Sequence, residues 1–211
     1  MGAFIALLAL DVILPSGGRT FWLQHPEFWV FPLQTVVCAV ILWRFWLAYE
    51  FGRPRGLALG IGVGVLVFAL WISPQSFLGF EPRRSGFNPE LFAAQPALFW
   101  FTVTLRFLRL VVIVPLVEEI FWRGFLLRYL IDEKFERVPF GSFSWLSFIA
   151  VTAAFALSHS PADWPAAILT GALYNWVAYR TKSLSTCVVT HALTNLLLGA
   201  WIMYTKQWGF W

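Results

Sequence analysis

The feature that most constrains this fold is a series of long apolar runs, separated by clusters of proline, glycine and charged residues. A helix needs about 20 mainly apolar residues to cross the ~30 Å hydrocarbon core of a bilayer, and several runs reach that length. Hydrophobic residues make up 59% of the 211-residue chain and charged residues only 12%. The sequence therefore predicts an all-α, polytopic membrane protein that forms one integral membrane domain over residues 1–211.

The apolar runs predict six to eight membrane helices. The expected spans are residues 1–14, 28–49, 57–72, 96–131, 143–159, 166–179 and 184–204. Residues 96–131 would measure about 54 Å as one straight helix, which exceeds the bilayer. We therefore expect a tilted or interfacial start and a break near Pro115, whose ring removes a backbone hydrogen bond. Gly60 and Gly64 form a Gly-x-x-x-Gly pair that would allow close helix packing.

The basic residues lie mainly in connecting segments, so we interpret the net charge of +4 as a topology signal and expect no nucleic-acid partner. The positive-inside rule separates two sets. The cytoplasmic set is Arg53, Arg55, Arg128, Lys134, Arg137, Arg180 and Lys182, and the opposite set is Arg19, Arg83, Arg84 and Lys206. This topology puts His159 and His191 at different depths unless helices are tilted, shifted or broken. Cys38 and Cys187 lie in apolar runs and are expected to be buried free thiols.

Two adjacent glutamates, Glu118 and Glu119, interrupt one of the most apolar parts of the chain, residues 110–130. An intramembrane carboxylate costs roughly 2.5 kcal/mol or more at the bilayer centre, so it usually marks a functional site. Arg123 follows Glu119 by four residues, which places both on one helix face and lets Arg123 neutralise the carboxylate. Glu118 lies about 100° around the helix and has no such partner.

Two further pairs of residues four apart lie in apolar runs: Phe155 with His159, and His191 with Asn195. A carboxylate removed from water binds a proton more readily and can act as a general base, and a histidine can help it activate a water. A histidine and an asparagine can donate hydrogen bonds to the oxyanion that forms when water attacks an amide. Glu118 with His159 would activate water, and His191 with Asn195 would hold the oxyanion.

Other interpretations use the same residue types. Each group alone is often a structural contact, and a transporter or proton pathway would also place ionisable residues inside the membrane. Glu118, His159 and His191 would form a two-histidine, one-carboxylate metal set, although the His-Glu-x-x-His spacing is absent. No Gly-x-Ser-x-Gly elbow is present either. The residues alone leave a hydrolase and a transporter open.

The three groups together resemble a known family. Glu118 to Arg123 resembles the Glu-Glu-x-x-x-Arg motif of the CAAX protease and bacteriocin-processing (CPBP, or Abi) family of intramembrane endopeptidases. The pairs Phe155/His159 and His191/Asn195 are similar to its Phe-x-x-x-His and His-x-x-x-Asn motifs, in the same order. The resemblance covers residues 110–198. It implies that Glu118 and His159 activate water and that His191 and Asn195 bind the oxyanion, with Glu119, Arg123 and Phe155 in support.

The family has been described both as metal-dependent and as a glutamate-type protease. We favour the second and expect no cofactor, because Asn195 is a poor metal ligand and a good oxyanion donor; a divalent metal stays an open alternative. Length and an aromatic-rich ending also resemble the CAAX-protease-related proteins that accompany bacterial exosortase sorting systems. That likeness implies a multi-pass protein of the bacterial cytoplasmic membrane acting on a membrane-associated protein or peptide. A non-catalytic immunity or assembly factor that retains the motifs is a further alternative.

Overall fold

The computed structural model describes residues 20–81 and 86–211, and in these ranges the chain is helical with no strand. The all-α expectation is therefore confirmed. The expected first helix over residues 1–14 lies outside the described residues, as do Arg19, Arg83 and Arg84 of the topology argument.

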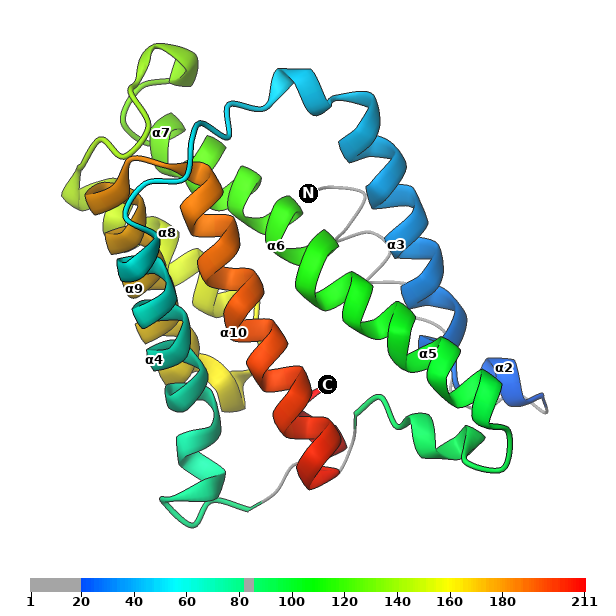
Figure 1. Ribbon diagram of the computed structural model, residues 1–211. Helices are drawn as coiled ribbons and strands as arrows, with labels where there is room; N and C mark the ends of the chain where they lie inside the picture. Colours follow the sequence, from blue (N-terminus) through cyan, green and yellow to red (C-terminus); the bar gives the residue numbers. More distant parts are fainter. Residues whose placement is uncertain (1–19, 82–85) are drawn as a thin grey trace.

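Six long helical segments make up the described part of the chain (Figure 1). They are α3 (Glu27–Arg44), α4 (Leu57–Ser76), a composite of α5 (Pro96–Leu108), α6 (Val114–Glu119) and α7 (Leu127–Tyr129), then α8 (Trp145–Leu157), α9 (Trp164–Thr181) and α10 (Leu184–Thr205). The short helix α2 (Phe21–Gln24) and the turns η1 (Trp46–Ala48), η2 (Pro89–Phe92), η5 (Phe135–Arg137), η6 (Pro161–Asp163) and η7 (Trp208–Phe210) connect or flank them.

Four of these segments are long and apolar enough to cross a membrane: Glu27–Arg44, Leu57–Ser76, Pro96–Tyr129 and Leu184–Thr205. Large apolar side chains remain exposed on their outer faces, for example Val36 on α3 and Val65 on α4, and Ile149 is exposed on the shorter α8. The exposure of such large apolar surfaces to water is unfavourable, whereas lipid chains would cover them. The protein is therefore a polytopic membrane protein, as expected.

The predicted break near Pro115 is wrong, because the helix continues from Pro96 to Tyr129 over 34 residues. Two π-helical segments, η3 (Arg109–Ile113) and η4 (Ile120–Leu126), lie within it. In the π register Leu110 would bond to the N–H five residues on, but that residue is Pro115, which has none. Asn195 Nδ2 on α10 donates to the Leu110 carbonyl instead, at 2.8 Å. A side chain from a neighbouring helix thus satisfies the group that the proline leaves open.

Other boundaries also differ from the expected ones. α3 ends at Arg44, five residues before the predicted end, and α4 continues through Pro74 to Ser76. α8 has only 13 residues and ends at Leu157, so His159 follows the helix and does not lie within it. At 1.5 Å per residue α8 is about 20 Å long, shorter than the hydrocarbon core.

The long α5–α7 helix crosses the molecule diagonally beside α10, with α3 on one side of this pair and α4, α8 and α9 on the other (Figure 1). α4 packs closely on α10 at the predicted glycines. A Cβ atom at Gly60 would come within 2.6 Å of Thr190 Oγ1, and one at Gly64 within 2.9 Å of the Thr190 carbonyl oxygen. Thr194 Oγ1 also donates to the Gly64 carbonyl at 3.0 Å. The Gly-x-x-x-Gly prediction is confirmed, and α10 is held where its polar residues can face α6.

Candidate active site

The four residues predicted to be catalytic line one cavity of about 360 Å³. Glu118 comes from α6, His159 from the loop after α8, and His191 and Asn195 from α10. The expected difference in depth between His159 and His191 does not separate them, because the short α8 ends before it could cross the membrane. The catalytic assignment itself stays a prediction.

Glu119 and Arg123 form the buried pair that their spacing predicted. Arg123 Nη1 donates to Glu119 Oε1 at 3.1 Å, and both side chains are 0% exposed. Two charges buried without water are tolerated only when they are paired and hydrogen-bonded. Neither residue lines the cavity, so this pair lies behind its wall.

His191 contacts the same carboxylate, which the sequence did not predict. Its Nδ1 lies 2.8 Å from Glu119 Oε1, the oxygen that also accepts from Arg123. A carboxylate only accepts hydrogen bonds, so Nδ1 of His191 carries the hydrogen. Nε2 is then the ring nitrogen left for the cavity, which His191 lines.

Glu118 occupies the opposite situation. Its side chain is half-buried and lines the cavity, and it makes no hydrogen bond or ion pair with any residue in the described ranges. The neighbouring glutamates therefore differ as predicted: Glu119 is held by partners, whereas Glu118 is available to a ligand or water in the cavity.

His159 is oriented by the backbone of α8. Its Nδ1 lies 2.8 Å from the Phe155 carbonyl oxygen, and because a carbonyl only accepts, Nδ1 carries the hydrogen here too. The ring packs against Trp71 and Phe155, with centroids 5.6 and 4.7 Å away. In the neutral ring Nε2 is therefore an acceptor that could bind the hydrogen of a water.

Phe155 connects this histidine to the buried pair. Its side chain is 2% exposed, and the Arg123 guanidinium lies over its ring at 5.1 Å from the centroid. Phe155, the first residue of the Phe-x-x-x-His pair, thus supports two residues. The Phe155 carbonyl orients His159, and the Phe155 ring packs against Arg123.

Several residues around the site were missed by the sequence reasoning. Asn175 on α9 accepts from Arg123 Nε at 3.1 Å, and an amide within an apolar helix is a signal that could have identified it. Tyr174 lines the cavity and donates to Thr194 Oγ1 at 2.8 Å. Trp71 and the segment 209–211 also line the cavity, but aromatic residues are too common in this chain to single them out.

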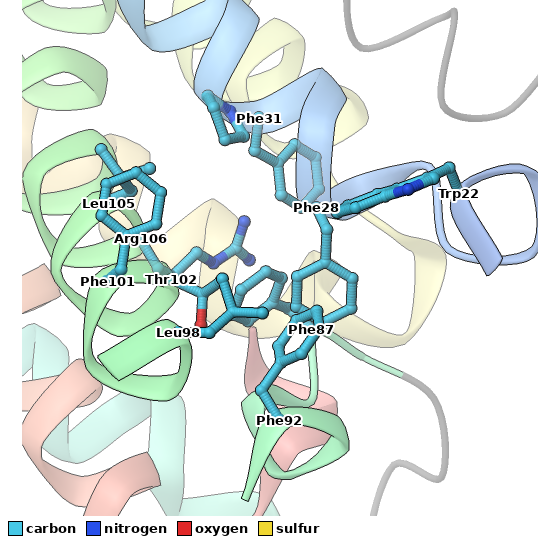
Figure 2. Close-up of a pocket in the computed structure, with 11 residues that line it drawn as sticks. Trp22, Phe28, Phe31, Phe87, Phe92, Leu98, Phe101, Thr102, Leu105 and Arg106 are labelled. Carbon is cyan, nitrogen blue, oxygen red and sulfur yellow. The ribbon is translucent and has the colours of Figure 1, made fainter. Parts of the chain in front are cut away.

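A second, smaller cavity of about 80 Å³ lies between α2, α3, η2 and α5 (Figure 2). Aromatic side chains surround it, including Trp22, Phe28, Phe87 and Phe92. The guanidinium of Arg106 lies over the ring of Phe31 at 4.5 Å and over that of Phe87 at 5.0 Å. Its lining is almost entirely apolar, and none of the predicted catalytic residues reaches it.

The alternative metal set does not form in this arrangement. Within residues 20–81 and 86–211, no three histidine, cysteine, aspartate or glutamate side chains are grouped so that they could hold a metal ion. Nδ1 of each cavity histidine is engaged by Phe155 or Glu119.

Comparison with known proteins identifies the motif-bearing part of the chain. Residues 99–197 match the family model of the Rce1-like type II CAAX prenyl endopeptidases, and this segment contains Glu118 to Arg123, Phe155 to His159 and His191 to Asn195. No curated protein and no solved structure matches the chain. The match supports an intramembrane CAAX endopeptidase and does not address the exosortase sub-family. The match over residues 99–197 therefore supports the assignment of this part of the chain to the CAAX protease and bacteriocin-processing family.

Proposed function

We propose that this protein is a glutamate-type intramembrane endopeptidase in which Glu118 and His159 activate a water molecule. The observation that carries the proposal is that Glu118, His159, His191 and Asn195, from three separate segments, line a single cavity. Polar side chains that converge inside an apolar helical bundle need a reason, and hydrolysis of a peptide bond uses all four.

The Glu118 carboxylate and Nε2 of His159 activate the water, because neither has a hydrogen-bond partner among the described residues. Glu118 has no hydrogen-bond partner among the described residues, so its carboxylate takes a proton from the water as the oxygen attacks the carbonyl carbon. His159, with Nδ1–H on the Phe155 carbonyl, orients the same water through Nε2. Glu118 then gives the proton to the leaving amine, so that one water and one amide yield a carboxylic acid and an amine.

Oxyanion binding falls to Asn195 and His191. One hydrogen of Asn195 Nδ2 goes to the Leu110 carbonyl at 2.8 Å, and the second is free to reach the cavity. His191 faces Glu119 through Nδ1–H, so it donates to the oxyanion through Nε2 only when the ring also carries a hydrogen on that nitrogen. The negative charge of the developing oxyanion favours that form of the ring.

The substrate we propose is a membrane-associated protein or peptide whose scissile bond reaches the cavity from the bilayer. A cavity among lipid-facing helices admits a segment already held at the membrane, because such a segment needs no transfer from bulk water. The bacterial cytoplasmic membrane and an exosortase sorting system are the setting we propose for it.

Comparative proteomics of membranes tests this function. Cells expressing the wild type, Glu118→Gln or a Glu133→Gln control in the exposed loop after α7 are compared for cleaved membrane proteins. The wild type and the control should share at least one product that Glu118→Gln lacks. Identical products in all three would contradict the proposal, and a change in ion or proton flux instead would favour a transporter. Full complementation by Glu118→Gln would favour a non-catalytic factor.

A further inference from the structure

We infer that Asn175, a residue outside all three motifs, is a positioning residue that acts through Arg123 and Glu119 to set the orientation of His191. This inference rests on the proposed function for its catalytic meaning, because it concerns how the oxyanion-binding histidine is held. Asn175 does not line the cavity, so any influence on the reaction must pass through its neighbours.

The first step is the orientation of Asn175 itself, which is fully buried. Arginine has no acceptor, so the amide oxygen of Asn175 must face Arg123 Nε, 3.1 Å away. The amide nitrogen donates to Thr152 Oγ1 at 3.1 Å and to the Phe148 carbonyl at 3.5 Å, both on α8. Each end of the amide therefore has partners that only one orientation satisfies, and α8 holds it there.

The second step is the constraint on Arg123. Its guanidinium is planar with donors in a fixed fork, and three of them are engaged: Nε by Asn175, Nη1 by Glu119, and Nη2 by the Gly171 carbonyl at 3.3 Å. Two of these acceptors belong to α9. Because the fork is rigid, the contacts with α9 determine where Nη1 points.

The third step carries the constraint to the histidine. Glu119 Oε1 accepts from Arg123 Nη1 at 3.1 Å and lies 2.8 Å from His191 Nδ1. Because both contacts use one oxygen, a shift of the guanidinium changes the position of the acceptor that holds the His191 ring. A continuous series of buried polar contacts thus joins α8, α9, α6 and α10, and ends at a ring that lines the cavity. Such outer contacts fix histidine tautomer and ring orientation in other sites.

The alternative is that Asn175 only satisfies a buried donor. A purely structural role predicts a loss of stability but no change in the His191 ring in molecules that remain folded. A positioning role predicts a change in the ring itself. The two can be separated because the chain has only three histidines, so their ring nitrogens can be resolved and assigned by ¹⁵N NMR with His25→Gln and His159→Gln variants.

The experiment compares three variants of the full chain, ¹⁵N-labelled at histidine and reconstituted in bilayers. Asn175→Leu removes both polar ends at nearly constant shape. Asn175→Asp keeps the oxygen that accepts from Arg123, and Thr152→Val removes one of the two acceptors on α8 and leaves the Phe148 carbonyl to hold the amide. In the wild type, His191 should show the Nδ1–H form. Asn175→Leu should show a mixture of tautomers, whereas Asn175→Asp and Thr152→Val should retain the wild-type signature.

A cleavage assay, once a product is known, gives the second readout. Asn175→Leu should lower kcat on the order of 10- to 100-fold with KM changed less than about threefold, because a small misplacement of a catalytic group lowers the rate of the chemical step more than binding. Asn175→Asp should recover most of that loss.

An unchanged His191 signature in folded Asn175→Leu would overturn the inference. If Asn175→Leu does not fold, loss of the wild-type signature in Asn175→Asp, or its loss in Thr152→Val, would also overturn it. The NMR readout needs no substrate. Failure of the protease proposal, seen as identical products with Glu118→Gln, is therefore distinguishable from failure of this inference.

Discussion

The cavity and the buried network of Arg123, Glu119 and Asn175 behind it are formed by neighbouring residues. Their polar side chains differ, because those of the network are hydrogen-bonded to one another whereas key groups in the cavity have no bonding partner in the described part of the chain. In the network Arg123 donates to Glu119 and to Asn175, and Glu119 also accepts from His191. Arg123, Glu119 and Asn175 are fully buried. In the cavity Glu118 has no bonding partner among the described residues, and Nε2 of His159 is left open. The contrast supports the proposal that the network maintains the structure and holds the histidine, whereas the cavity residues perform the chemistry.

Replacing Arg123 should produce the largest loss of stability. Arg123→Leu leaves the Glu119 carboxylate buried without its cationic partner, which typically costs about 3–5 kcal/mol. Thermal unfolding in detergent, monitored as the fraction of protein that remains folded at each temperature, measures the effect. The double variant Glu119→Gln/Arg123→Leu removes both charges and should recover part of the stability; equal loss in both would argue against the ion pair as the cause.

Replacing Asn195 should affect both cleavage and stability, because this residue lines the cavity and also donates to a backbone carbonyl of the long α5–α7 helix. Asn195→Leu removes a donor for the oxyanion, and loss of one such donor lowers kcat by on the order of 100-fold. It also leaves the Leu110 carbonyl without its 2.8 Å donor, at a cost of about 1–3 kcal/mol. Parallel measurement of cleavage and unfolding separates the two effects. Normal cleavage by folded Asn195→Leu would remove Asn195 from the proposed mechanism.

A change at the α4–α10 contact should lower stability with the smallest effect on chemistry. At Gly60 an added methyl would meet Thr190 Oγ1 at 2.6 Å, whereas at Gly62 nothing lies within 4 Å. Gly60→Ala should therefore destabilise by about 1–3 kcal/mol through overpacking, and Gly62→Ala should be close to neutral. Cleavage per folded molecule should change little in either. Equal stability of the two variants would show that the close approach of these helices is unimportant.

Local spacing was sufficient to predict part of the site. Residues four apart on a helix share a face, so the Glu119–Arg123 pair and the separate position of Glu118 could be predicted from the sequence. The close packing of Gly60 and Gly64 is also local, because small residues permit it whatever the partner helix.

Contacts between distant segments could not be predicted in this way. The bond between His191 and Glu119 joins residues 72 positions apart, and no periodicity specifies which side chains meet across helices. The prediction of a break at Pro115 was wrong for the same reason. The carbonyl of Leu110 that Pro115 leaves without a donor is satisfied by Asn195, which lies 85 positions further along the chain. The role of Asn175 likewise emerges only once α8 and α9 are placed side by side.

The most direct test of this account compares the two adjacent glutamates in one experiment. Glu118→Gln and Glu119→Gln each remove one carboxylate charge from neighbouring positions, and both are measured for thermal unfolding and for cleavage of the same substrate. We predict that Glu118→Gln unfolds like the wild type but loses about 1,000-fold in cleavage rate, within the range for general acid–base groups. Glu119→Gln should be destabilised by about 3–5 kcal/mol, because Arg123 remains buried without its anion. Wild-type cleavage by Glu118→Gln, or wild-type stability of Glu119→Gln, would contradict the account.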